Sequence, residues 1–428
     1  MNLILKMDSE DTFNYDDCDK VIDFSKSDSF SYTFWELKRR FHTWYETQAL
    51  DLLYISLAVF AADRLCLRNS ASDAWCRNFK LYIPVINKIL FENNKELLQH
   101  MISFLTGDRW EFCFRERELT KQELNHKNRK IRKKDIVKEY DQVCMFSGGL
   151  DSFVGAIDLL ESSNNTSTLF VSHYGGGKGT KEYQDFLKSK FIEKYQLDER
   201  DFCQFYAKVV GGVEDTTRSR SFMFFAHAIV LASALGKPVD LIIPENGLIS
   251  LNIPLTLSRI GSSSTRTTHP YYIGKLQQLI DNLGLKISFK NPYQFKTKGE
   301  MLQECQNQDF MKAYFNNTMS CSHPDIGRMK SEKEAKHCGY CLPCVVRQAA
   351  ILKANLQDTN SYRDKFFMLG PNEKTIYNSY LLGLNKFNPD KAFMTIQMNG
   401  NIEKDIEKFT DLYIRGMEEL KKYLEALK

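Results

Sequence analysis

The feature that most constrains the fold of this 428-residue chain is a glycine pair between an apolar run and a helix-like segment. Residues 143–146 have the pattern of a short buried strand, and residues 153–160 have that of a helix. Between them lies Ser-Gly-Gly-Leu-Asp-Ser at 147–152. The glycines let the backbone approach an anion where a Cβ atom would intrude, and the free N–H groups of a helix start favour negative charge. This arrangement predicts a phosphate-binding turn.

Three polar side chains of the turn add to that prediction. Ser147 and Ser152 supply hydroxyl donors, and Asp151 is suited to hold Mg2+ against phosphates. We therefore expect these three residues in catalysis and the whole turn in cofactor binding. The segment lacks the Gly-Lys-Ser/Thr end of a Walker A motif, and a turn that only joins strand to helix is the alternative interpretation. The cofactor-binding turn consists of Ser147, Gly148, Gly149, Leu150, Asp151 and Ser152.

The stretch around this turn alternates strand-like and helix-like segments. The alternation predicts an α/β domain over residues 141–356, with a doubly wound parallel sheet and ligands at the carboxyl ends of its strands. A glycine-rich run at 175–179 follows the second strand and is either a nucleotide-contacting turn or a flexible loop. The further apolar runs lie at 169–172, 202–209, 239–243 and 287–289, with helical stretches such as 221–235 between them.

The region before this domain shows no catalytic constellation. We expect residues 1–125 to form a small α+β domain, because the apolar stretch at 50–67 is helix-like. Alternating apolar and polar residues at 79–83 and 110–114 predict two strands.

Two lysine-rich segments flank the central domain. Residues 126–140 are expected to be a basic linker, whose run at 127–134 is either a phosphate grip or a solvated connection. Residues 357–428 are expected to be a helical extension. Apolar residues recur there at spacings of three and four from Ile402 to Leu427, which predicts a stripe that either docks on its own chain or binds a partner.

Four of the chain's cysteines are close in sequence. Cys338, Cys341 and Cys344 are spaced by three residues, and Cys321 lies upstream. Four thiolates complete the tetrahedral coordination of Zn2+, which predicts a closed, structural site. An iron–sulfur cluster and free thiols are the alternatives, and His323 or His337 could replace Cys321 as a ligand.

Composition limits where the protein acts. The net charge of +4 is small for this length and gives no support to a broad nucleic-acid surface. No window approaches the ~18 to 20 apolar residues that a membrane span needs, and the N-terminus lacks the pattern of a signal peptide. We expect a cytoplasmic protein without a membrane partner, and association into a homo-oligomer stays open.

These motifs together resemble a known enzyme family. The turn matches the SGGxDS signature of the PP-loop ATP pyrophosphatases, which cleave ATP between the α and β phosphates. A PP-loop followed by a Cys…Cys-Gly-x-Cys-x-x-Cys pattern resembles the QueC family, the 7-cyano-7-deazaguanine synthases, over about residues 140 to 355. The resemblance implies an adenine nucleotide alpha hydrolase-like fold. The longer layout is similar to the QueC-like proteins of anti-phage systems such as Qat (QatC) or type IV CBASS.

The resemblance also implies roles for residues outside the turn. The segment at 220–224 is similar to the family's Arg-Asn-x-x-Phe helix start, with Ser221 in place of the asparagine. Residues 291–300 are similar to the family's lysine-containing segment, which implies that Lys298 is catalytic and approaches the nucleotide phosphates. His173 and Arg220 are expected to contact the nucleotide.

The substrate segment of the family, Asp-Tyr-Ser-Gly-Tyr-Pro-Asp-Cys, is absent from this chain. Glu245 and Asn246 follow a strand end in its place, where they could read the edge of a guanine-like base. Arg266 and His269 could meet a carboxylate or a second phosphate, and Arg218 completes the expected substrate-binding set. A capping or turn role is the alternative for each.

The reaction implied by the resemblance is adenylation of 7-carboxy-7-deazaguanine, with ATP, Mg2+ and Zn2+ as cofactors. A nitrogen nucleophile would then attack, and we expect the amine of a partner protein, because the additional segments offer docking surface. Ammonia is the alternative and leads to the free nitrile. A PP-loop tRNA-modifying enzyme and a non-catalytic nucleotide-binding protein remain as other classes.

Overall fold

The computed structural model describes residues 1–427 except 38–40, 42, 131–137, 163–165, 176–177, 217, 256–265, 328–331 and 333. Parts of the basic run at 127–134 and of the glycine-rich run at 175–179 therefore lie outside the described residues.

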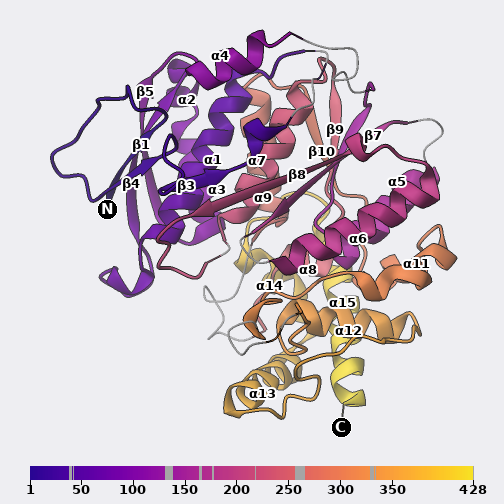
Figure 1. The fold of residues 1–428 in the computed structure, drawn as a ribbon. Coiled ribbons are helices and arrows are strands. Elements are labelled where there is room, and N and C mark those ends of the chain that lie inside the picture. Colours follow the sequence, from indigo (N-terminus) through magenta and orange to yellow (C-terminus); the bar gives the residue numbers. More distant parts are fainter. Residues whose placement is uncertain are drawn as a thin grey trace.

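A central six-stranded sheet confirms the prediction of a parallel α/β domain (Figure 1). Its strand order is β10-β9-β6-β7-β8-β3, with every pair parallel except β3–β8. The parallel strands start in the middle at β6, continue outward to β8, and resume on the other side of β6 at β9. The topological switch point, where such sheets bind ligands, therefore lies between β6 and β9. The strands are β3 (Phe30–Tyr32), β6 (Gln142–Met145), β7 (Thr168–Tyr174), β8 (Phe202–Val209), β9 (Val239–Ile242) and β10 (Ile287–Lys290).

Helices cover both faces of this sheet, as a strand buried on two sides requires. Alternate residues of β6 show the division: Val143 and Met145 belong to one hydrophobic core, and Cys144 belongs to another. The first core includes α7 (Arg220–Ser233) and α9 (Pro270–Asn282). The second includes α5 (Leu150–Ser162), α6 (Lys178–Tyr195) and α11 (Gln308–Tyr314).

The N-terminal region has a sheet of its own, but it shares a core with the central domain. Its four strands are all parallel, in the order β2-β1-β4-β5, whereas the sequence pattern predicted an α+β arrangement. α1 packs on α7 and α3 packs on α9, so two helical layers lie between the two sheets (Figure 1). β3 also joins the central sheet. The elements are β1 (Asn2–Lys6), β2 (Lys20–Asp23), α1 (Thr47–Leu65), β4 (Asn78–Val85), α2 (Lys88–Asn93), α3 (Lys95–Thr106), β5 (Arg109–Glu116) and α4 (Lys121–Asn128).

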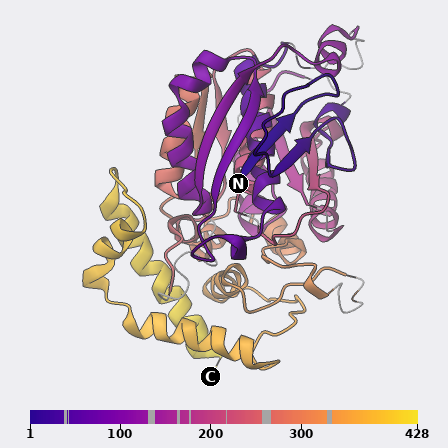
Figure 2. The same cartoon turned by 90° about the vertical axis from the view of Figure 1, so that its left-hand side faces the viewer.

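The helical extension forms a third core beneath the central domain (Figure 2). α15 packs on α8, α12 and α14, and its apolar residues from Phe409 to Leu424 are buried there. Of the two readings left open for this stripe, the structure shows docking on its own chain. The helices of the extension are α13 (Pro371–Lys386), α14 (Ala392–Asn399) and α15 (Ile406–Ala426), and they face α8 (Gly247–Leu251), α10 (Lys298–Gln303) and α12 (Leu342–Lys353) of the central domain.

Within the described ranges, no helix has both the length and the apolar character that crossing a membrane would require.

Candidate functional site

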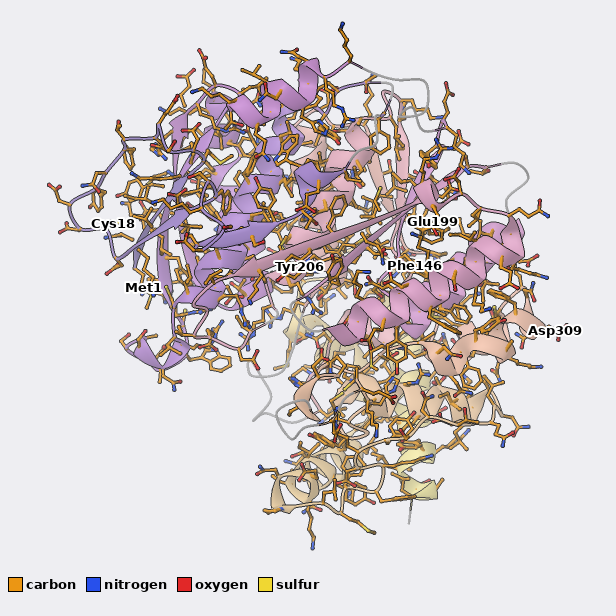
Figure 3. All side chains as sticks on the ribbon, viewed as in Figure 1. Met1, Cys18, Phe146, Glu199, Tyr206 and Asp309 are labelled. Carbon is orange, nitrogen blue, oxygen red and sulfur yellow. The ribbon has the colours of Figure 1, made fainter. Side chains whose placement is uncertain are left out.

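The glycine turn follows β6 and is tied to the end of β7. It begins after Phe146, which is labelled near the centre of the molecule in Figure 3. Gly148 has φ +81°, and a Cβ atom there would lie 2.9 Å from Cγ of Gln184. Both the backbone angle and the space therefore demand glycine. The Gln184 amide donates to the carbonyls of Ser147 (2.9 Å) and His173 (3.0 Å), which holds the two strand ends together.

Two hydroxyls line the start of α5. Ser147 Oγ and Ser152 Oγ are 3.1 Å apart, and Ser152 Oγ donates to the Gly149 carbonyl at 3.0 Å. The amide of Gly149 donates to Ser147 Oγ at 3.3 Å. The structure thus places both predicted serines together at the N-terminus of a 13-residue helix, where an anion would be stabilised.

A charged cluster joins three chain segments beside this turn. Asn246 Nδ2 donates to Asp151 Oδ2 at 2.7 Å, and Lys298 Nζ lies 3.2 Å from Asp151 Oδ1. Asp151 comes from the turn after β6, Glu245 and Asn246 from the turn after β9, and Lys298 from the start of α10. The cluster therefore occupies the switch point of the sheet, with Asp151 only 6% exposed and Lys298 only 5% exposed.

Burial and the neighbouring charges shift the pKa values of the two carboxyl groups of the cluster in opposite directions. Burial and the Asp151 carboxylate raise the pKa of Glu245 well above its ordinary value. Burial also opposes ionisation of Asp151. The Lys298 ammonium and the hydrogen bonds that Asp151 accepts nevertheless hold the pKa of Asp151 below its usual range. In the protein alone, Glu245 is therefore the protonated partner and Asp151 the ionised one.

The cluster fits a hard divalent cation such as Mg2+. Among the described residues, no donor makes a hydrogen bond to the buried Asp151 Oδ1, although Lys298 is near. That oxygen and the half-buried Glu245 carboxyl are the oxygen ligands such an ion prefers.

The four predicted cysteines form one compact cluster. Their sulfur atoms all lie within 4.8 Å of one another, and Cys338 Sγ is 3.9 Å from Cys344 Sγ. Four thiolates at ~2.3 Å around one zinc ion would be about 3.8 Å apart, so the set fits Zn2+. An iron–sulfur cluster would separate the cysteines further, because irons and sulfides lie between them.

The flanking histidine at 337 has a different role from the one left open by the sequence. His337 Nε2 accepts a hydrogen bond from the amide of Ser320 at 3.2 Å. The neighbouring Met319 amide donates to the Gly148 carbonyl at 2.9 Å. The segment that leads to Cys321 therefore runs directly against the glycine turn. Neither this link nor the bridge made by Gln184 belongs to a recognisable sequence motif.

The two remaining nucleotide-binding predictions lie at the same edge of the sheet. His173 is near the end of β7, is buried, and its Nε2 accepts or donates no hydrogen bond within the described part of the chain. Burial and the nearby charge of Arg220 hold the pKa of His173 well below 6.5, so the ring is neutral. Arg220 is exposed at the first turn of α7.

Three predicted substrate residues contact other parts of the molecule. Arg218 donates to the Thr106 carbonyl at 2.8 Å, and Arg266 donates to the Phe104 carbonyl at 3.2 Å. His269 Nδ1 accepts from the Tyr271 amide and caps α9, as the capping alternative expected. No hydrogen bond or ion pair found among the described residues joins these three to the Asp151 cluster, and their substrate role stays a prediction.

Comparison with known proteins finds a family similarity in one part of the chain. The family model described as "Queuosine biosynthesis protein QueC" matches residues 265–355. The matched segment is similar to that family and contains Lys298 and all four cysteines of the cluster, whereas the glycine turn lies before it. No curated protein matches the chain.

Proposed function

We propose that this protein uses ATP and Mg2+ to adenylate the carboxylate of a 7-deazaguanine, 7-carboxy-7-deazaguanine being the expected substrate. The observation that carries the proposal is the meeting of the Ser147–Gly149 turn with Asp151, Glu245 and Lys298 at the switch point of the sheet. The QueC match over 265–355 supports a QueC-like, ATP-utilising activity and the choice of substrate class.

The chemistry of the first step follows from this arrangement. A carboxylate oxygen of the substrate attacks the α-phosphorus of ATP, the bond to the bridging oxygen breaks, and pyrophosphate leaves. The turn's amides and the hydroxyls of Ser147 and Ser152 would hold the phosphates. Lys298 would stabilise the negative charge that develops on the leaving pyrophosphate. When bound by Asp151 and Glu245, Mg2+ would supply further neutralisation of the phosphates.

The second step transfers the activated carbonyl to nitrogen. An amine attacks the acyl carbon, the carbonyl–adenylate bond breaks, AMP leaves, and the nitrogen releases a proton. We propose the amine of a partner protein of an anti-phage system as the acceptor, with ammonia as the alternative. Exposed apolar side chains on the extension support a protein acceptor, since such groups favour protein contacts. Five of them are Phe366, Met368, Leu369, Met394 and Met398.

The cysteine cluster would act structurally. With zinc bound by four thiolates, the site has no open position for a reactant. Its ion would fix the segment that donates to the Gly148 carbonyl, and so hold the glycine turn in place.

The proposal is tested by measuring AMP and pyrophosphate from the zinc-replete protein with ATP and Mg2+, with and without 7-carboxy-7-deazaguanine. Substrate-dependent release of both products is the expected result. Mass spectrometry of the mixture then separates nitrile, amide and protein adduct. ATP binding without AMP formation in the presence of this substrate would refute the deazaguanine assignment.

A further inference from the structure

The N-terminus of α10, which carries Lys298, depends on the C-terminal helix for one hydrogen bond. Thr297 caps α10: its Oγ1 accepts from the Glu300 amide at 3.2 Å, and its own amide donates to Glu300 Oε2 at 2.8 Å. The hydroxyl proton of Thr297 is left over in this capping box. It is donated to Glu419 Oε1, on α15 and 122 residues further along the chain.

The buried Glu419 carboxylate belongs to a charge network whose other members are partly exposed. This carboxylate is 7% exposed and accepts from Lys353 Nζ at 2.7 Å. Lys353 also lies 3.3 Å from Glu300, and Arg415 Nε donates to Glu300 at 2.8 Å. Two negative and two positive side chains therefore neutralise one another at the junction of α10, α12 and α15. A buried carboxylate needs such a partner, and the paired groups link α10 to both α12 and α15.

The start of α10 packs closely against Glu419 and Lys353. A Cβ atom on Gly299, next to Lys298, would lie 2.7 Å from Cδ of Lys353 and 3.0 Å from Oε2 of Glu419. Arg415 also donates to the Phe295 carbonyl at 2.8 Å, ahead of the capping residue. The start of α10 is thus held against α15 from both sides of Lys298.

The same helix supports the second turn of the candidate site. A Cβ atom on Gly247, directly after Asn246, would lie 2.3 Å from Cδ2 of Leu412. One on Gly416 would lie 2.6 Å from Cδ1 of Leu248. Glycines at both places let α15 approach the turn after β9 more closely than any other residue would allow.

We propose that α15 is a positioning element of the active site and that Glu419 is the positioning residue for Lys298. Through Thr297, Glu419 fixes the first turn of α10, and with it the ammonium group that faces Asp151. The helical extension is then required for the chemistry and is not only a docking surface. The kinetic side of this inference rests on the proposed function, whereas the structural side does not.

The test compares Glu419→Ala with Glu419→Gln and with Glu418→Ala as the matched control. Glu418 is the neighbouring residue on α15 and is exposed. The alanine variant at 419 should lower kcat for pyrophosphate release about tenfold, with the KM for ATP changed less than about twofold, because the charge that Lys298 stabilises develops in the transition state. The glutamine variant still accepts from Thr297 and should recover most of that loss. Glu418→Ala should match the unchanged protein.

Amide hydrogen exchange tests the structural side without any turnover. Glu419→Ala should speed exchange at residues 300–302 about tenfold and leave α5 unchanged, since the bond that holds the capping residue Thr297 against α15 is lost at α10 alone. Unchanged exchange at 300–302 in this variant would overturn the inference, as would equal kcat losses in the variants at 418 and 419. If the unchanged protein releases no pyrophosphate, the proposed function fails, and the exchange comparison alone decides the positioning role of Glu419.

Discussion

The packing of α5 against the turn after β9 is what brings Asp151 to Asn246, and one glycine makes it possible. A Cβ atom on Gly155 would lie 2.3 Å from Cβ and 2.6 Å from Cγ of Pro244. Carbon atoms in contact are normally ~3.5 to 4.0 Å apart, so α5 or the turn would have to move by about 1 Å. The proline ring cannot rotate away. We therefore predict that Gly155→Ala separates the two turns of the candidate site.

The magnitude of this effect follows from two opposing contributions. Overpacking of this kind costs ~1 to 3 kcal/mol. Replacing glycine by alanine inside a helix returns ~0.5 to 1 kcal/mol. Gly274 in α9 supplies the matched control, because a Cβ atom there would meet nothing within 4 Å. Gly274→Ala should gain only the stability that alanine adds inside a helix. The free energies of unfolding of the two variants should therefore differ by ~1 to 3 kcal/mol, the cost of the steric overlap at Gly155.

The assay is urea unfolding of both variants beside the unchanged protein, with pyrophosphate release measured on the folded proteins. Gly155→Ala should have a lower unfolding midpoint than Gly274→Ala and should lose activity, because Asp151 moves away from Asn246 and Glu245. Equal midpoints would refute the close packing. A destabilised variant with full activity would refute the claim that this packing positions the catalytic groups.

Four further predictions concern separate features. Lys298→Met should lower kcat for pyrophosphate release about 100-fold at saturating ATP while the protein stays folded. The variant lacks the ammonium group that stabilises the negative charge on the leaving pyrophosphate. Cys344→Ser should reduce zinc from about one ion per chain, measured by elemental analysis, and should lower the melting temperature. Asp63→Asn should destabilise the protein by ~3 to 5 kcal/mol in urea unfolding, because the buried Arg68 and Arg77 would then share the carboxylate of Asp108 and leave one buried positive charge uncompensated. Burial lowers the pKa of His227 from 6.5 to about 4. Between these two pH values the unfolded chain binds a proton at this histidine and the folded protein does not. The free energy of unfolding should therefore fall by ~3 kcal/mol as the pH drops from 6.5 to 4. A His227→Gln variant should show a weaker pH dependence of its melting temperature.

Much of the central domain could be predicted because its signals are local. The apolar runs at 143–146 and 202–209 correspond to β6 and β8, and the glycine turn between β6 and α5 has the predicted neighbours. The strand positions also placed Glu245 and Asn246 at a sheet edge, and parallel winding then brought them to Asp151.

Other features depend on partners that are distant in sequence, and no local pattern reveals them. Arg218 and Arg266 meet carbonyls more than 100 residues away, at Thr106 and Phe104. The amphipathic pattern of α15 predicted an apolar stripe, but not the polar residues beside it that reach Thr297. β3 has only three residues, and its place in the central sheet is set by pairing with β8.

Pro84 shows the same limit within a strand. The alternation at 79–83 predicted a strand that stops before Pro84, whereas β4 continues to Val85 with Pro84 opposite Arg115 of β5. β1 pairs with β4 only as far as Tyr82, so the proline lies where β4 has a ladder partner on one side.

Transfer of AMP to a carboxylate can be followed with 7-carboxy-7-deazaguanine labelled with 18O in its carboxyl group. Adenylation joins a carboxylate oxygen to the α-phosphorus, and the later attack of nitrogen leaves that oxygen on AMP. The AMP released should therefore carry one 18O atom, as measured by mass spectrometry. Unlabelled AMP, or release of ADP and phosphate in place of AMP and pyrophosphate, would contradict transfer of AMP to the carboxylate.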